Sequence, residues 1–350
     1  MNRGAKNDSA TSVLFINLKA NRHSRSRNYF HGLKKLGVAC EWLDIDGFGD
    51  LVRKRDELKS LLGEDAKVVI TSPSHVLVIG FVLTFFHRPV LDAGWPLYDG
   101  VITSRREFGF LGINLLKTFF IDFFAVHLSS IVLVESDLQK RRMSKRYLLA
   151  KGKLSILQTG FDETRFSQVE RSSSQKHFNV LFRGGAQEEA GLNVLAEAAR
   201  FLAGRDDLRF KVITNNFSLK SEIGQYFELV NRYISDVELE KCFEEADLVL
   251  GQLSDHERLE YTIPHKFFEA AFLAKPYLTS NVGFMKVLAD SNLVYTFSAG
   301  DSAELAASVE RIAKDRDVAR DVGVKLGDWY KKNASQKVLS EKFKQVVCGD

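Results

Sequence analysis

Cysteine is scarce in this sequence. The three cysteines, Cys40, Cys242 and Cys348, lie far apart in 350 residues and lack the close spacing of metal ligands. This distribution excludes a cysteine-rich metal site and predicts free thiols in a reducing compartment. The first twelve residues contain no apolar core, so we expect no secretory signal and a cytoplasmic protein.

The sequence also lacks an uninterrupted apolar run long enough to cross a membrane. The run 76–86 has eleven residues, whereas a helical span needs about 20. The segment 110–134 is long enough, but three ionisable residues interrupt it: Lys117, Asp122 and His127. Polar residues also recur there at a spacing of four: Asn114, Thr118 and Asp122. The pattern predicts a helix with one narrow polar stripe, which is either buried in a core or lies in a membrane interface.

Length and composition predict two globular domains. A chain of 350 residues is too long for one ordinary core, and 45% hydrophobic with 27% charged residues is typical of a folded soluble protein. Apolar runs alternate with helical patterns twice along the chain, which favours parallel sheets covered on both faces. The strands predicted in the first half are 13–18, 39–45, 67–71, 88–94, 129–136 and 153–160. Those predicted in the second half are 179–185, 209–215, 247–253 and 276–280.

The predicted fold class is therefore α/β, with two tandem Rossmann-like, doubly wound parallel-sheet domains. The polar, serine-rich segment 161–178 is the predicted linker. We assign 1–165 to an N-terminal domain and 177–328 to a C-terminal domain. The stretch 326–347 has a helical pattern, and we expect 329–350 to fold back onto the first domain. Neither domain has G-x-G-x-x-G in its first turn, which argues against a dehydrogenase.

Charge is distributed unevenly along the chain. Residues 1–176 hold 27 Lys and Arg against 18 Asp and Glu, whereas the remainder holds 22 against 27. A basic first half suggests an anionic partner, with a phosphate-bearing lipid, the inner membrane leaflet or nucleic acid as candidates. Scattered solvated lysines are the alternative. The basic stretch 139–153 favours a membrane surface. With Tyr147 as its one aromatic residue, it has no repeated interleaving of aromatic residues and cations, so we expect no nucleic acid.

One apolar segment, 260–280, carries two charges that call for an explanation. Pro264 is typical of the first turn of a helix, where free amide groups attract anions and Lys266 adds a cation. Glu269 lies one turn later among Phe and Ala residues and needs a partner. One interpretation is an exposed Lys266–Glu269 pair. The other is a nucleotide site, in which Lys266 meets a diphosphate and Glu269 accepts hydrogen bonds from ribose hydroxyls.

The segment resembles the donor-site signature of family 4 (group 1) glycosyltransferases, which have the two-domain GT-B fold. The resemblance rests on Tyr261-x-x-Pro264-x-Lys266-x-Phe268-Glu269 and on Lys275-Pro276 before a short strand. The stretches 155–166, 180–202 and 235–253 are similar in order and spacing to the family's interdomain hinge, the start of its second domain and the approach to its donor site. In this fold two Rossmann-like domains face a cleft.

The resemblance implies a set of donor-binding residues in the second domain. Glu269 aligns with the glutamate that binds the donor ribose, and Lys266 is placed near the diphosphate. Tyr261 takes the place of a first glutamate that contacts the sugar in many members. Many members also clamp the diphosphate with Arg and Lys, where this chain has Gly185 and Ala190. The remaining donor-binding candidates are Arg183, Gly184, Gly185, Pro264 and His265.

Asp92 is the candidate catalytic residue of the first domain, beside Lys266 in the second. It follows an apolar run at the predicted carboxyl end of a strand, where this fold places acceptor-side residues. A helix-capping or turn role is the alternative. The basic segment 21–28 is interpreted as a solvated loop or as a contact for an acceptor phosphate.

The function implied by the resemblance is transfer of a sugar from a nucleotide-diphosphate donor to an acceptor hydroxyl. The expected acceptor is a glycan or a lipid-linked saccharide, because the first half of the chain is basic and contains apolar segments. The family retains the anomeric configuration and usually needs no metal, so we expect no cofactor. The basic, apolar first half further predicts a role in cell-surface polysaccharide or glycolipid synthesis in the cytoplasm, with peripheral contact at the inner face of an anionic membrane. The alternative is a catalytically inactive protein of the same fold that binds nucleotide-sugar or glycan.

Overall fold

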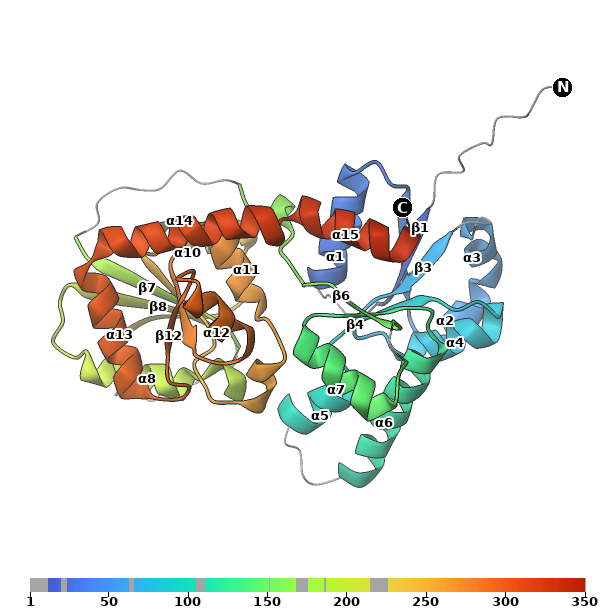
Figure 1. Ribbon diagram of the computed structural model, residues 1–350, viewed down its shortest axis with the longest axis horizontal. Helices are drawn as coiled ribbons and strands as arrows, with labels where there is room; N and C mark the ends of the chain where they lie inside the picture. The colour runs from blue at the N-terminus through green and yellow to red at the C-terminus, as the bar shows by residue number, and fades with distance from the viewer. Residues whose placement is uncertain are drawn as a thin grey trace. The chain divides into compact units, whose positions relative to one another are not determined.

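The computed structural model describes residues 12–19, 24–62, 66–104, 111–150, 152–167, 176–185, 187–214 and 226–349. The chain divides into two compact units. The N-terminal unit comprises Met1–Asp162 together with Gln336–Asp350, and the C-terminal unit comprises Glu163–Ser335. Each unit contains a six-stranded sheet with helices packed on both faces (Figure 1). The predicted α/β class with tandem doubly wound sheets is confirmed.

The N-terminal sheet is parallel and has the order β2-β1-β3-β4-β5-β6. Its strands are β1 (Val13–Leu18), β2 (Cys40–Ile45), β3 (Lys67–Ile70), β4 (Val90–Gly94), β5 (Val132–Val134) and β6 (Leu154–Ile156). Its helices are α1 (Ser24–Lys35), α2 (Phe48–Arg53), α3 (Arg55–Leu61), α4 (Val76–Phe85), α5 (Leu97–Ser104), α6 (Leu111–Leu128), α7 (Asp137–Tyr147) and α15 (Gln336–Cys348). Each predicted strand of the first half is present, with ends that shift by up to a few residues.

The continuous apolar strands of this unit face two separate cores. Along β1, Val13 and Phe15 pack on one side with α1 and α15, whereas Leu14 and Ile16 pack on the other with α2, α4, α6 and α7. Alternate strand residues point to opposite faces, so a strand that is apolar at every position requires helices on both faces.

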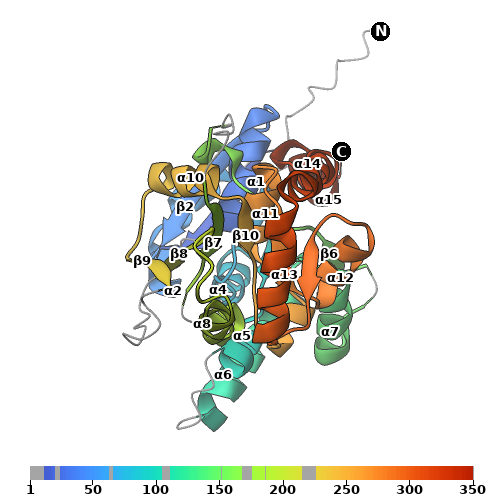
Figure 2. The ribbon, with the colours of Figure 1, turned by 90° about the vertical axis from the view of Figure 1, so that its left-hand side faces the viewer.

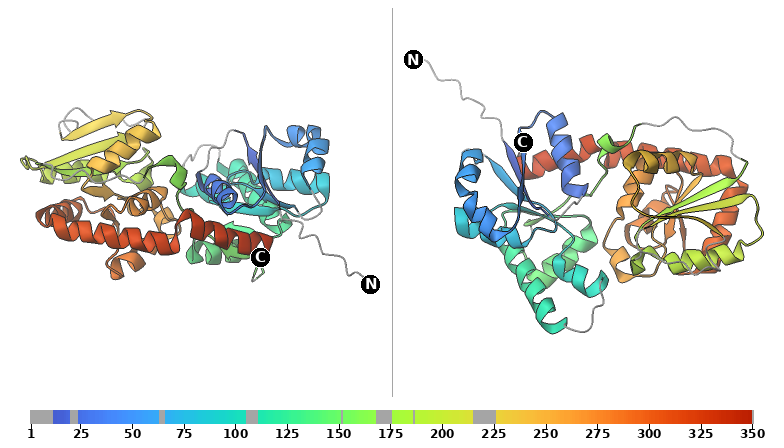
Figure 3. Two further views of the ribbon diagram at one scale, coloured as in Figure 1. Left: turned by 90° about the horizontal axis from the view of Figure 1, so that it is seen from above. Right: turned by 180° about the vertical axis from the view of Figure 1, so that it is seen from behind.

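The C-terminal helix α15 belongs to the N-terminal unit, where it packs beside α1 (Figure 3). The close approach depends on Gly32, because a Cβ atom there would lie 1.9 Å from Ser340 Oγ. The Gln336 side chain at the start of α15 accepts a hydrogen bond from Lys35 Nζ (2.6 Å) and donates one to Asn28 Oδ1 (3.1 Å). The single helix expected over 326–347 is instead two, because α14 ends at Asn333 before α15 begins.

Within the segment 110–134, α6 occupies Leu111–Leu128 and β5 follows at Val132–Val134. The carboxylate that interrupts the apolar run, Asp122, caps another helix. Asp122 is fully buried and accepts hydrogen bonds from the amides of Leu97 (3.2 Å) and Tyr98 (2.8 Å) at the start of α5. Burial raises the pKa of Asp122, although His75 and these amides act in the opposite direction. Within the described residues, no helix combines the length and apolarity that a membrane span needs.

The C-terminal sheet is also parallel, with the order β12-β11-β10-β7-β8-β9. Its strands are β7 (Phe178–Arg183), β8 (Leu208–Thr214), β9 (Phe227–Asn231), β10 (Leu248–Leu250), β11 (Tyr277–Ser280) and β12 (Tyr295–Phe297). Its helices are α8 (Leu192–Phe201), α10 (Asp236–Glu245), α11 (His265–Phe272), α12 (Gly283–Asp290), α13 (Ser302–Lys314) and α14 (Arg316–Asn333). Three short 3-10 helices are η1 (Glu163–Arg165), η2 (Glu188–Ala190) and η3 (Glu257–Glu260). Helices α8 and α13 lie side by side (Figure 2).

The two edge strands of this sheet, β9 and β12, were not predicted. Both are short, and most of their residues are partly or fully exposed, so neither has the continuous apolar pattern of the central strands. Part of the predicted linker, 168–175, lies outside the described residues.

Gly191, between β7 and α8, is required by its conformation and by its surroundings. Its φ is +70°, and a Cβ atom would lie 2.7 Å from the amide nitrogen of Ser254. We expect Gly191→Ala to cost about 1–2 kcal/mol from the left-handed backbone, with a further loss from the contact. Gly204→Ala is the matched control, because Gly204 has φ +90° but its Cβ would meet no described atom within 4 Å. Thermal unfolding should show a clearly larger fall in melting temperature for Gly191→Ala than for Gly204→Ala. Equal falls in melting temperature would contradict this account.

Candidate nucleotide-binding site

The candidate site lies at the point in the C-terminal sheet where the order of strand addition reverses. From β7 the chain proceeds outward to β8 and β9, then returns to β10 on the other side of β7. The carboxyl ends of β7 and β10 therefore adjoin at the topological switch point, where open parallel sheets bind ligands. Arg183 ends β7, Gly184 and Gly185 follow it, and Gly251 follows β10.

The start of α11 lies at this same switch point. Pro264 occupies the N-cap position with φ −61° and ψ 135°, so it precedes the helix and does not lie in its first turn. His265 is the first helical residue, and Lys266 and Glu269 follow on a helix packed among apolar residues. Tyr261 ends the preceding short helix η3, where its amide donates to the carbonyl of Arg258 (3.1 Å).

Glu269 is the centre of a buried charge cluster. Its side chain is 0% exposed, and one oxygen, Oε2, accepts a hydrogen bond from Arg183 Nη1 (2.7 Å). The other oxygen, Oε1, lies 3.2 Å from His265 Nδ1 and 3.8 Å from Arg165 Nη1. Burial raises the pKa of Glu269, but Arg183, His265 and Arg165 outweigh burial and lower the pKa to about 2. The carboxylate is therefore ionised at neutral pH and acts as an acceptor.

Lys266 is buried beside this cluster, with a different partner. Its Nζ atom donates to the carbonyl of Gly251 (2.9 Å) and lies 4.2 Å from the centre of the Phe182 ring. Gly184 also lies close to the Lys266 ammonium group, since a Cβ atom on Gly184 would lie 3.2 Å from Lys266 Nζ. Burial, together with the nearby Arg183 charge, lowers the pKa of Lys266 to about 7. Because Lys266 and Glu269 are both buried, the interpretation of an exposed pair is wrong.

Arg165 is a member of the cluster that sequence reasoning missed. It lies in η1, directly after the start of the C-terminal unit, and its Nε donates to Asp236 Oδ2 (3.0 Å). Its approach to Glu269 joins positions 104 residues apart, which no local pattern reveals. A second missed pair is Arg258 with the buried Glu189 (2.6 Å). Arg165 and Arg183 thus lie beside the Glu269 carboxylate, and Lys266 is buried next to this cluster with the Gly251 carbonyl as its partner.

Asp92, the candidate from the first domain, lies in a separate buried ion pair of the N-terminal unit. It is the third residue of β4 and is 0% exposed. Its Oδ1 accepts from Arg25 Nε (2.7 Å) and its Oδ2 accepts from Ser26 Oγ (2.8 Å). Asp92 lies within β4, two residues before its carboxyl end, and its carboxylate accepts from side chains of α1 instead of capping a helix or closing a turn. Its catalytic role stays a prediction. Arg25 belongs to α1 and is only 2% exposed, so the interpretation of 21–28 as a solvated loop fails for its described residues 24–28; 21–23 lie outside them.

The chemistry of the cluster fits an anionic ligand that also carries hydroxyl groups. Guanidinium and ammonium groups bind phosphate, and an ionised carboxylate accepts hydrogen bonds from hydroxyls. Within the described ranges, no group of three or more His, Cys, Asp or Glu side chains is arranged to hold a metal ion.

Similarity to known proteins appears in the fold alone. No protein-family model and no curated protein matches this sequence. Anabaena HepE in complex with UDP is 11% identical, with a TM-score of 0.68 over 97% of this chain and 100% of that chain. Sucrose-phosphate synthase from Thermosynechococcus elongatus is 12% identical, with a TM-score of 0.73 over 96% of this chain and 98% of that chain. A glycosyltransferase from Rickettsia africae is 11% identical, with a TM-score of 0.65 over 97% and 99%. The chain therefore has the two-domain α/β architecture of GT-B glycosyltransferases.

Proposed function

We propose that this protein is a retaining glycosyltransferase of the family 4 type that uses a nucleotide-diphosphate sugar. The observation that carries the proposal is the buried Glu269 carboxylate beside Arg183 and Lys266 at the switch point of the C-terminal sheet. The fold is shared with HepE in complex with UDP and with UDP-glucose, so a uridine nucleotide is the first donor to test. The proposed acceptor is a hydroxyl of a glycan or lipid-linked saccharide in cell-surface polysaccharide or glycolipid synthesis.

Each residue of the cluster has a proposed role. Glu269 accepts hydrogen bonds from the ribose hydroxyls, since its two oxygens retain acceptor capacity beyond Arg183 and His265. Arg183, whose side chain is 32% exposed, both orients Glu269 and presents its remaining N–H groups to the diphosphate. Lys266 adds a further cation. Negative charge grows on the diphosphate as the glycosidic bond breaks, so these cations stabilise the transition state.

The cluster also supplies a cation in place of the usual clamp. The positions of the Arg and Lys common in the family are Gly185 and the buried Ala190. Arg183 lies two residues before Gly185 and at the end of β7, close to where a clamp is needed. We propose that Arg183 and Lys266 provide the positive charge and that no metal is needed for donor binding.

A catalytically inactive binding protein is the second candidate function. It is favoured by one observation, that Arg183 and Glu269 neutralise each other and positions 185 and 190 carry no charge. Thermal stability should be measured with UDP, GDP, ADP and CMP and with their sugars, followed by assays for release of the free nucleotide. Stabilisation with nucleotide release supports the transferase, whereas stabilisation without release at any acceptor supports the binding protein. The absence of stabilisation by any nucleotide would contradict the proposed donor site.

Proton uptake offers a separate test of Lys266. With a pKa of about 7, Lys266 is mostly neutral at pH 8. A bound diphosphate favours the charged form and raises this pKa, so binding of UDP-glucose should be accompanied by net proton uptake, at most one proton per site, at pH 8. Calorimetry at pH 8 in two buffers of different ionisation enthalpy measures the uptake. UDP-glucose is preferred to UDP because its phosphates do not titrate near this pH.

The control for this test is Lys266→Met, which keeps an unbranched side chain of similar length. Uptake should disappear in the variant while residual binding persists. Binding of UDP-glucose to the wild type without proton uptake would place the diphosphate away from Lys266.

A further inference from the structure

The N-terminal unit exposes large apolar side chains around the carboxyl end of α6. Phe86 follows α4 and is 90% exposed, Leu148 follows α7 and is 84% exposed, and Phe124 of α6 is 47% exposed. Helices α4 and α6 pack together (Figure 1). The chain just before Leu148 reaches the same place, because His127 Nε2 lies 2.9 Å from the carbonyl oxygen of Tyr147.

Two of these residues are held in an unfavourable backbone conformation. Phe86 has φ 55° and Leu148 has φ 52°, and each is the C-cap of its helix in the left-handed region. Glycine and asparagine are the usual residues at such caps, and a bulky apolar side chain is uncommon there. A side chain that is both strained and almost fully exposed contributes little to the core of this unit. The two positions therefore have no evident role in folding.

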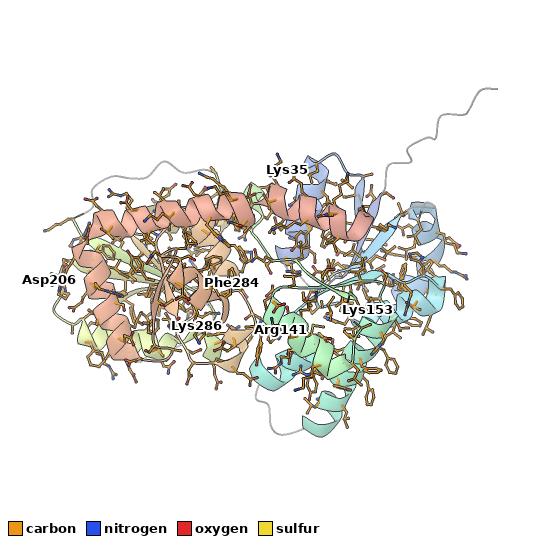
Figure 4. The ribbon with its side chains drawn as sticks, in the orientation of Figure 1. Lys35, Arg141, Lys153, Asp206, Phe284 and Lys286 are labelled. Atoms are coloured by element: carbon orange, nitrogen blue, oxygen red, sulfur yellow. The ribbon has the colours of Figure 1, made fainter. Side chains whose placement is uncertain are left out.

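Cations surround the same end of the helix. Arg88 Nη2 (2.9 Å) and Lys153 Nζ (2.6 Å) both donate to the carbonyl of His127. Figure 4 shows Lys153 close to this end of α6. Among the described residues neither cation has a carboxylate partner, and the pKa of Lys153 is lowered by burial and by Arg88. Lys145, in the last turn of α7, is a further exposed cation.

Capping of α6 explains why cations lie at this point, since a helix carboxyl end attracts positive charge. It does not explain the exposed Phe86, Phe124 and Leu148. Apolar side chains with lysine and arginine around them match the chemistry of an anionic bilayer. The acyl region of the bilayer accepts the apolar side chains, and its phosphate groups attract the cations. A protein partner would be complementary to the apolar groups but has no general reason to be anionic.

We propose that the end of α6, formed by Phe86, Arg88, Phe124, Leu148 and Lys153, docks on an anionic lipid bilayer. The surface lies wholly in the N-terminal unit and shares no residue with the donor cluster. Its use is independent of the proposed donor chemistry, so each can fail without the other.

The test is vesicle flotation with the purified full chain. Wild type should float with vesicles of phosphatidylcholine containing phosphatidylglycerol, and at least tenfold less with phosphatidylcholine alone. The variant Phe86→Asn/Leu148→Asn should lose at least tenfold in affinity for the anionic vesicles. Asparagine tolerates the left-handed conformation, so this variant should fold at least as well as wild type. Arg88→Gln/Lys153→Gln should weaken binding and reduce its dependence on salt.

The matched control is Phe201→Asn/Tyr233→Asn, which removes two exposed aromatic side chains, 65% and 86% exposed, from the C-terminal unit. It should bind anionic vesicles like wild type. Equal flotation of Phe86→Asn/Leu148→Asn and wild type overturns the proposal, as does the absence of wild-type flotation. Self-association of the wild type without vesicles is measured in the same preparation. If Phe86→Asn/Leu148→Asn abolished that self-association, the surface would be assigned to a second copy of this chain. Thermal stabilisation of Phe86→Asn/Leu148→Asn by UDP-glucose tests the donor site independently of vesicle binding.

Discussion

Glu269→Gln should lose donor binding and turnover by roughly 100-fold, which corresponds to about 2.7 kcal/mol. The substitution keeps the shape of the side chain and an oxygen that can accept from Arg183, but it removes the negative charge. Hydrogen bonds from hydroxyls to a charged acceptor are stronger than those to a neutral amide, and the ribose offers two hydroxyls. The measurements are the affinity for UDP by calorimetry and kcat/KM for release of UDP from the donor that the stability screen identifies.

Glu260→Gln is the matched control for this prediction. Glu260 lies next to Tyr261 but outside the cluster, where its Oε2 accepts from the amide of Gly283 (3.1 Å). We expect this variant to bind UDP within about twofold of wild type, because it touches none of the proposed donor groups. If Glu260→Gln lost binding and Glu269→Gln retained it, the assignment of the ribose to Glu269 would be wrong.

Asp92→Ala should destabilise the N-terminal unit by about 3–5 kcal/mol, because it leaves the Arg25 guanidinium buried without its closest counter-charge. Arg25 is 2% exposed, and its other neighbours are Thr159, to which Nη1 donates (3.2 Å), and Glu135, 3.7 Å away. Urea unfolding followed by tryptophan fluorescence measures the effect. A Trp329→Phe background makes the signal specific, since the remaining tryptophans, Trp42 and Trp95, both lie in the N-terminal unit.

The double variant Arg25→Met/Asp92→Leu separates a structural from a catalytic role for Asp92. Replacing both charges with apolar groups removes the unpaired guanidinium but takes a cation from Glu135, 3.7 Å from Arg25. The double variant should therefore recover part of the stability that Asp92→Ala loses. Both variants should then be assayed for nucleotide release. If Asp92→Ala were as stable as wild type yet inactive, the ion pair would not be the main role of Asp92 and a catalytic role would be favoured.

The donor cluster was partly predictable because some of its members are close in sequence. Charge placed in an apolar helix identifies Lys266 and Glu269, whereas Arg183 is a candidate only through the resemblance to the glycosyltransferase family. Their burial was not predictable, since an i,i+3 pair of this kind is usually exposed. Arg165 was missed because its contact with Glu269 depends on how η1 packs within the C-terminal unit.

The sequence by itself determined the α/β class and the central strands of both sheets. Continuous apolar runs between helices are compatible with few arrangements other than a parallel sheet covered on both faces. The edge strands β9 and β12 were not predicted, because half-exposed strands have a weak hydrophobic pattern. Tertiary structure alone decided which charges meet: Arg25 with Asp92, Asp122 with the start of α5, and Arg183 with Glu269. Such pairs form because a buried charge must find a counter-charge or donor wherever the fold places one, whatever the separation along the chain.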